Sequence, residues 1–119
     1  MEKLLVVDDN EDLRSMFSFM LNQYEVIQAS NGIEAVKLFE EQQPKLVLMD
    51  IIMPEMDGIE ATRRIITSNP NALILAITAF STRAGEMLSV GAQDVILKPV
   101  RKRQLLKMIE DLLSKASAS

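Results

Sequence analysis

Five short, mostly apolar segments alternate along the chain with longer amphipathic segments. The apolar segments are residues 4–7, 25–29, 46–49, 73–77 and 95–97. The first and third lack the alternation of apolar and polar residues that marks a strand with one solvated face. They predict strands of a parallel sheet that is covered on both faces.

The segments between these strands show the three- and four-residue spacing of amphipathic helices. Four helices are marked by Leu13, Met16, Phe17, Met20 and Leu21; by Ile33, Val36 and Phe39; by Ile59, Thr62, Ile65 and Ile66; and by Leu105, Met108, Ile109, Leu112 and Leu113. Ser30 and Asn31 are suitable capping residues for the second helix. A further helix, over about residues 82–90, is predicted to be marginal and mobile, because Gly85 costs up to about 1 kcal/mol relative to Ala.

The order of these elements predicts an α/β domain with (βα)5 topology. Alternating strands and helices with short connections imply a five-stranded parallel sheet, helices on both faces and right-handed crossovers. A chain of 119 residues has room for one such domain. We expect it to occupy residues 1–115, with residues 116–119 forming a frayed tail or a cut linker.

Composition narrows the chemistry that is available. The net charge of -4 argues against direct binding of nucleic acid or an anionic membrane, since both favour a basic surface. The chain has no Cys and no His, which leaves carboxylates, hydroxyls, Lys and backbone groups. No apolar run approaches the roughly 18 residues of a membrane span, so we expect a soluble, cytoplasmic protein.

Polar residues follow or end four of the predicted strands. Asp8 and Asp9 follow the first, Asp50 the third, Thr78 the fourth and Lys98 the fifth. In a parallel sheet these ends meet at one edge, where ligands of such folds bind. Clustered carboxylates favour a hard cation with oxygen ligands, and Mg²⁺ fits best. A cation and an ammonium beside a nucleophilic carboxylate suit phosphoryl transfer.

Each of these residues also has an ordinary structural interpretation. Asp8 and Asp9 could cap the following helix, Thr78 could fill a strand, and Lys98 could be an exposed loop charge. Asp50 is harder to explain in this way, because no obvious helix starts after it. The coincidence at four strand ends favours a functional site.

The chain resembles the bacterial and archaeal response-regulator receiver domains of two-component signalling, and in particular chemotaxis regulators. The resemblance covers essentially the whole chain, and its motifs are Val6-Val7-Asp8-Asp9, Leu48-Met49-Asp50, Met53-Pro54, Asp57-Gly58, Thr78-Ala79, Gly91-Ala92 and Lys98-Pro99. It implies a flavodoxin-like fold and a phosphorylation-dependent switch.

The resemblance also implies a role for each site residue. Asp50 would accept a phosphoryl group from a sensor histidine kinase or phosphotransferase, and the protein would catalyse this transfer itself. Asp9 would bind Mg²⁺ directly and Asp8 through water, with Asp50 and the Ile52 carbonyl completing the protein ligands. The Thr78 hydroxyl and Lys98 would contact the phosphoryl group, and a cis Lys98–Pro99 bond would direct the lysine.

Departures from the family pattern bear on output. Val95 and Val100 stand where the family usually has aromatic residues. The structural change on phosphorylation that a partner would detect is therefore expected to be smaller, or to be carried by the backbone. The apolar residues Ile52 and Phe80 flank the site, which predicts slow self-dephosphorylation.

The expected partners are the phosphodonor kinase and an output protein or a fused effector domain. Asp94 and Arg103 suggest a monomer or a weak dimer through the face between Glu86 and Glu110. The basic run at residues 101–103 on that face is either a docking site or a solvated helix start. The kinase and the pathway stay open at this point.

Three other functions are compatible with such a fold. An aspartyl phosphohydrolase would carry an Asp-x-Asp motif, whereas the first strand here ends in Asp8-Asp9-Asn10. A nucleotide- or flavin-binding module would need a glycine-rich loop after that strand, and none follows. A receiver that never meets phosphate and acts as a constitutive interaction module stays open because the aromatic residues are missing.

Overall fold

The computed structural model describes residues 1–118 and confirms the alternating topology. The elements are β1 (Lys3–Val7), α1 (Glu11–Met20), β2 (Glu25–Ala29), α2 (Gly32–Gln42), β3 (Leu46–Asp50), α3 (Gly58–Ser68), β4 (Ile74–Thr78), η1 (Ser81–Arg83), α4 (Ala84–Ser89), β5 (Asp94–Leu97) and α5 (Lys102–Ala118). Strand boundaries differ from the predicted ones by at most one residue at each end.

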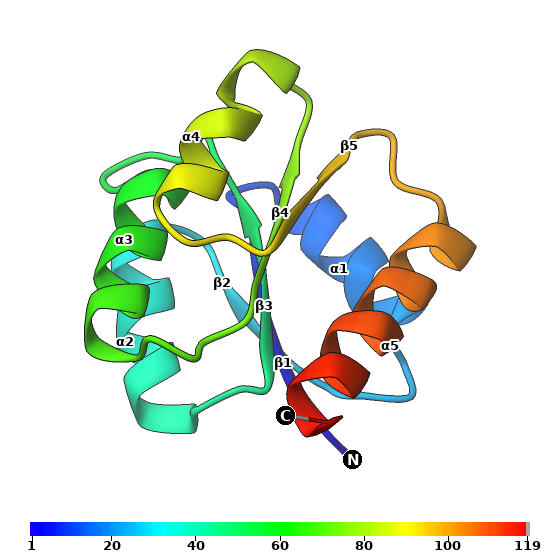
Figure 1. The fold of residues 1–119 in the computed structure, drawn as a ribbon. Helices are drawn as coiled ribbons and strands as arrows, with labels where there is room; N and C mark the ends of the chain where they lie inside the picture. Colours follow the sequence, from blue (N-terminus) through cyan, green and yellow to red (C-terminus); the bar gives the residue numbers. More distant parts are fainter. Residues whose placement is uncertain (119) are drawn as a thin grey trace.

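The five strands form one parallel sheet in the order β2-β1-β3-β4-β5 (Figure 1). This is the flavodoxin-like order, with the change of winding direction between β1 and β3. Every residue of β3 and β4 is buried, and for β3 the absence of alternation predicted this. The carboxyl ends of these central strands therefore meet at one edge of the sheet.

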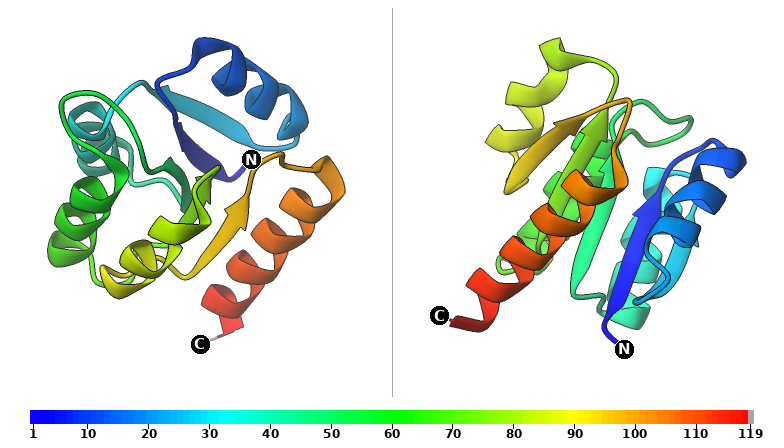
Figure 2. Two further views of the ribbon diagram at one scale, coloured as in Figure 1. Left: turned by 90° about the horizontal axis from the view of Figure 1, so that it is seen from above. Right: turned by 90° about the vertical axis from the view of Figure 1, so that its right-hand side faces the viewer.

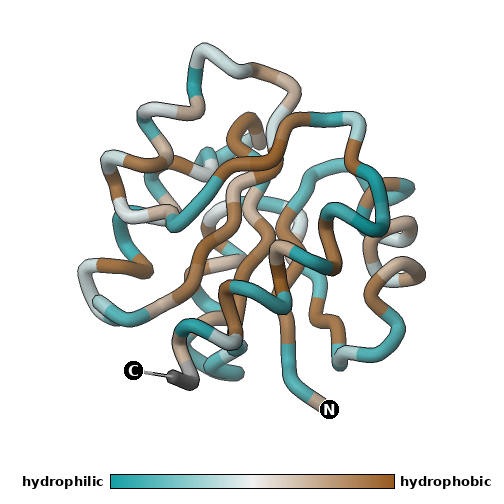
Figure 3. The backbone as a smooth tube through the Cα atoms, turned by 45° about the vertical axis from the view of Figure 1, so that its right-hand side comes forward, coloured by the Kyte–Doolittle hydropathy of each residue, from teal (hydrophilic) through white to brown (hydrophobic). Residues whose placement is uncertain are grey.

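Helices cover both faces of the sheet. Seen from above, α1 and α5 lie on one side, and α2, α3 and α4 lie on the other (Figure 2). Alternate residues of each strand enter the two cores: Leu4 packs in the core with Phe17 and Ile109, and Leu5 packs in the core with Phe39 and Ile65. The apolar residues accordingly follow the central strands (Figure 3).

Three helices begin at a side-chain cap. Asn10 caps α1, Asn31 caps α2 and Asp57 caps α3, each by accepting a backbone N–H three residues further on. Asn31 was one of the two predicted capping residues. The α1 cap is Asn10, which leaves the carboxylates of Asp8 and Asp9 free of that structural role.

The fourth helix is the shortest. α4 has six residues, follows the 3-10 turn η1 and has no side-chain cap, and Met87 is its buried residue. Gly85 lies inside it, as predicted; its mobility stays a prediction. The last helix, α5, is longer and continues to Ala118. Ser119 lies outside the described residues. The interpretation of residues 116–119 as a tail or linker stays a prediction.

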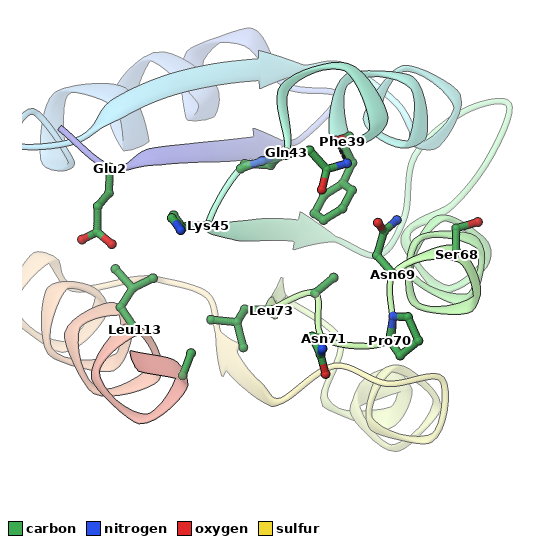
Figure 4. A pocket seen from close by; sticks show the side chains of 13 residues that line it. Glu2, Phe39, Gln43, Lys45, Ser68, Asn69, Pro70, Asn71, Leu73 and Leu113 are labelled. Atoms are coloured by element: carbon green, nitrogen blue, oxygen red, sulfur yellow. Dashed lines mark hydrogen bonds between the residues drawn. The ribbon is translucent and has the colours of Figure 1, made fainter. Parts of the chain in front are cut away.

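A cleft of about 700 Å³ opens at the amino ends of the strands (Figure 4). Glu2, Lys45 and Leu73 line it, and each immediately precedes a strand. The cleft therefore lies at the opposite edge of the sheet from the predicted site. None of the helices in the described part of the chain is both long and apolar enough to cross a membrane.

Candidate functional site

The predicted site residues come together at the carboxyl edge of the sheet. Asp8 and Asp9 follow β1, and Asp50 is the last residue of β3. One carboxylate oxygen from each of these three residues lies within 4.8 Å of the others. Lys98, just after β5, places its Nζ 3.3 Å from Oδ2 of Asp8 and 3.6 Å from Oδ2 of Asp50. The structure thus assembles four residues from three distant segments of the sequence.

Burial distinguishes the three carboxylates. Asp8 is 2% exposed and Asp50 is 9% exposed, whereas Asp9 is exposed. Oδ1 of Asp50 accepts the Ile51 N–H at 2.9 Å, and its other oxygen faces Lys98. The ammonium group of Lys98 contacts two of the three carboxylates, so the cluster has an excess of negative charge.

This excess changes the acidity of Asp50. Burial and, after it, the Asp8 carboxylate raise the pKa of Asp50 from 3.8 to about 6, although Lys98 and the Ile51 N–H act in the opposite direction. At pH 7 about one tenth of Asp50 is then protonated in the absence of a bound cation. Most molecules therefore carry an ionised, poorly compensated carboxylate at the end of β3.

Thr78 lies beside this cluster on the neighbouring strand. Asp50 pairs with Ile77 in the sheet, so Thr78 is one residue further along β4. Its side chain is fully buried, and Oγ1 accepts the N–H of Phe80 at 3.0 Å. The Thr78 carbonyl accepts the Lys98 N–H at 2.9 Å. The backbone of Thr78 thus supports the lysine, while its hydroxyl oxygen contacts the segment that leads into η1.

The two apolar residues predicted to flank the site lie on the loops after β3 and β4. Ile52 is 48% exposed and Phe80 is 51% exposed. The peptide bond between Lys98 and Pro99 is cis, as expected. The role of the Ile52 carbonyl as a metal ligand stays a prediction.

Two contacts that hold the site together were not predicted from the sequence. The N–H of Gly58 donates to the Ile51 carbonyl at 2.7 Å, and a Cβ at position 58 would lie 1.9 Å from the carbonyl oxygen of Asp50. The start of α3 therefore rests directly on the end of β3. In addition, the Arg14 guanidinium donates to the backbone carbonyl of Asp8 at 2.7 Å. Gly58 was noticed only as part of the Asp57-Gly58 motif of the family resemblance, without this contact. Nothing in the sequence pattern indicated the contact of Arg14.

The donor set at this edge fits a hard divalent cation. Its carboxylate oxygens come from Asp8, Asp9 and Asp50, and the chain has no Cys or His that would favour a softer metal. The excess negative charge of the three carboxylates favours binding of a cation over an empty cluster.

Comparisons with known proteins agree with this fold and site. The family model "Response regulator receiver domain" matches residues 4–110, and the chain therefore belongs to that family. Among curated relatives, "Chemotaxis protein CheY" of Listeria monocytogenes is 37% identical over 115 residues, which cover 92% of this chain and 97% of the relative.

Solved structures give the same result. A CheY-like receiver domain protein from Methanospirillum hungatei superposes with a TM-score of 0.94 at 27% identity, covering 99% of this chain and 98% of that one. The response regulator TrrA from Thermotoga maritima, solved in complex with Mg²⁺ and BeF, gives a TM-score of 0.88 at 32% identity, covering 94% of this chain and 99% of that one. The chain is thus a receiver domain, a module of phosphorylation-controlled signal transduction, with an acidic site able to bind a metal.

Proposed function

We propose that Asp50 accepts a phosphoryl group from a sensor histidine kinase or a phosphotransferase, and that this modification changes binding of an output partner. The observation that carries the proposal is the position of Asp50. Its carboxylate is buried at the end of β3, has a pKa near 6, and lies beside two further carboxylates and the Lys98 ammonium. An ionised Asp50 oxygen would attack the phosphorus of a phosphohistidine, the P–N bond would break, and an acyl phosphate would form on Asp50.

We assign the metal site to Mg²⁺, with Asp8, Asp9, Asp50 and the Ile52 carbonyl as its ligands. When bound, the cation would neutralise charge on the carboxylates and on the incoming phosphoryl oxygens. The solved complex of TrrA with Mg²⁺ and BeF supports this assignment. The all-oxygen cluster of this chain supports it independently.

Lys98 and Thr78 would contact the phosphoryl group. Lys98 already bridges Asp8 and Asp50, so its ammonium is positioned to hold an anion that forms on Asp50. The Thr78 hydroxyl keeps its proton available for donation, because its oxygen accepts from Phe80. These residues would let the protein catalyse its own phosphorylation from a small phosphodonor.

Loss of the phosphoryl group is proposed to be slow. Ile52 and Phe80 are the residues that flank the site on the loops after β3 and β4, and neither side chain can orient an attacking water. Replacing Phe80 with Glu should accelerate decay of the acyl phosphate, measured as loss of the phosphorylated mass over time. An equal or slower decay in Phe80→Glu would count against this part of the proposal, and Phe80→Leu is the matched apolar control.

The output face is proposed to lie between Glu86 and Glu110. Val95 is half-buried against the core on the side of α4, so the face has no aromatic ring at that position. The carboxylate of Asp94 accepts the N–H of Val95 at 2.8 Å, and Arg103 is exposed on α5. A weak dimer through Asp94 and Arg103 stays a prediction, as does the identity of the output partner.

The direct test is phosphorylation by acetyl phosphate. Purified protein with Mg²⁺ should gain a single phosphoryl group by intact mass, and chelation of the metal should prevent this. Asp50→Asn should gain none, whereas Asp57→Asn, which keeps the α3 cap, should be phosphorylated like the wild type. Phosphorylation of Asp50→Asn would refute the assignment of the site, and steady turnover of phosphate esters would favour a phosphohydrolase instead.

A further inference from the structure

Arg14 connects α1, β2 and the metal-binding loop in one hydrogen-bonded network. Its Nη1 donates to the backbone carbonyl of Asp8 at 2.7 Å, and its Nε donates to Oε1 of Gln28 at 3.1 Å. The amide of Gln28 in turn donates to the Ser18 hydroxyl, which donates to the Arg14 carbonyl. The side chain of Arg14 is therefore held by β2 and by the loop after β1, and its carbonyl accepts a hydrogen bond from Ser18 of the same helix.

The carbonyl that Arg14 holds belongs to the peptide bond between Asp8 and Asp9. Several other contacts fix Asp8: its N–H donates to the Ala29 carbonyl, its Oδ1 accepts the N–H of Asn10, and its Oδ2 lies 3.3 Å from Nζ of Lys98. The Asp9 side chain is exposed, so its direction depends on the orientation of the backbone that carries it. The Arg14 guanidinium, which also binds Gln28, fixes that peptide plane better than a water molecule would. The reason is that charge-assisted hydrogen bonds are stronger than hydrogen bonds between neutral groups.

We infer that Arg14 is a positioning residue for the metal site, which orients the Asp8–Asp9 peptide so that both carboxylates are presented to a divalent cation. The inference rests on the proposed function and goes beyond it, since Arg14 would contact neither the metal nor the phosphoryl group. Within the part of the chain whose side chains are described, its guanidinium forms no ion pair, so its hydrogen bonds to Asp8 and Gln28 define its role.

Charge and position make opposite predictions for this residue. Arg14 carries a positive charge near an acidic cluster, so a purely electrostatic effect of removing it would strengthen Mg²⁺ binding. Loss of positioning would weaken Mg²⁺ binding instead. The sign of the change in Mg²⁺ affinity therefore separates the two effects.

The experiment measures Mg²⁺ affinity of the full chain by titration calorimetry at fixed ionic strength. Arg14→Met, which keeps the length of the side chain, should bind Mg²⁺ about 10- to 150-fold more weakly, the range expected for one charge-assisted hydrogen bond. Arg14→Lys keeps the charge but not the planar fork, and should restore only part of the affinity. Arg64→Met on α3 removes an equal charge from an exposed ion pair with Glu60 and should bind Mg²⁺ as the wild type does.

A second measurement, without metal, tests the positioning directly. Amide hydrogen exchange followed by NMR should be faster for Asn10 in Arg14→Met. The N–H of Asn10 donates to Oδ1 of Asp8, and a less well fixed Asp8–Asp9 peptide would weaken this hydrogen bond. Core amides such as those of β3 should exchange at the wild-type rate, which shows that the fold is intact.

The outcomes separate this inference from the proposed function. Unchanged or tighter Mg²⁺ binding by Arg14→Met, or unchanged exchange of Asn10, would overturn the positioning role. A wild-type protein that binds no Mg²⁺ at millimolar concentrations would overturn the metal assignment of the proposed function and this inference with it.

Discussion

Replacing Asp50 with Asn should stabilise the metal-free protein, although it removes the residue on which the proposed function depends. Asp50 has a folded-state pKa of about 6 against an ordinary value of 3.8. The folded state therefore binds this proton more tightly than the unfolded state does. Stability contributed by Asp50 is present at low pH and is lost as the pH rises through the interval between these two values.

The size of the effect follows from the shift. A difference of about two pKa units corresponds to about 3 kcal/mol at pH 7, where ionisation of Asp50 in the folded protein is nearly complete. Asn has a similar shape and can still accept the Ile51 N–H, but its amide group is a weaker partner for Lys98 than a carboxylate. We therefore expect Asp50→Asn to gain about 1–3 kcal/mol at pH 7, and about 1 kcal/mol or less at pH 4.5.

The assay is urea unfolding of both proteins in a chelating buffer and then in Mg²⁺. Mg²⁺ should stabilise the wild type by binding only its folded state, and should stabilise Asp50→Asn less, so the difference between them should shrink. Asp9→Asn is the matched control, because it removes the same charge from an exposed position and should gain less. Equal stability of Asp50→Asn and wild type at pH 7 without metal would refute the reasoning, as would a gain that does not depend on pH.

Local features of the structure lead to four more predictions. Gly58→Ala should lower stability by about 1–3 kcal/mol and weaken Mg²⁺ binding, because its Cβ would overlap the Asp50 carbonyl; urea unfolding and calorimetry measure both. Gly85→Ala meets no atom within 4 Å and should stabilise the protein by about 0.5–1 kcal/mol in the same unfolding assay; a loss would contradict the α4 geometry. Asn10→Ala should cost about 1 kcal/mol on urea unfolding through loss of the α1 cap, and Asn10→Ser should retain most of it. Mg²⁺ affinity measured by calorimetry should fall as the pH drops below about 6, since protons compete for Asp50; constant affinity from pH 7 to pH 5 would contradict the raised pKa.

Much of the fold could be predicted because each strand contributes side chains to both hydrophobic cores, one on each face of the sheet. Buried central strands such as β3 have to be apolar on both faces, so the first polar residue after the run, Asp50, marks the carboxyl edge. Parallel topology then brings that residue to Asp8 and Lys98 without any knowledge of contacts. The convergence of the site was therefore visible in a pattern of single residues at strand ends.

The contacts that support the site could not be predicted in the same way, because they depend on tertiary geometry. Gly58 is required by the approach of α3 to the carbonyl of Asp50, but glycine also occurs at helix starts that contact no other element. Arg14 lies on the same helix as the apolar residues that predicted α1, where a charged residue usually indicates a solvated surface. Its contact with Asp8 depends on where β2 places Gln28.

The connection between the site and α4 gives a physical route for output without an aromatic residue at position 95. The oxygen of the Thr78 hydroxyl accepts the N–H of Phe80, the residue directly before η1. A Thr78 side chain that turned toward a phosphoryl group on Asp50 would leave that N–H without its acceptor, and the backbone of η1 would have to move to satisfy it. Such a movement would act on α4, which is short, has no side-chain cap and is anchored in the core through Met87. Without a ring at Val95, the backbone between Thr78 and α4 would therefore be the route by which phosphorylation of Asp50 changes the output face.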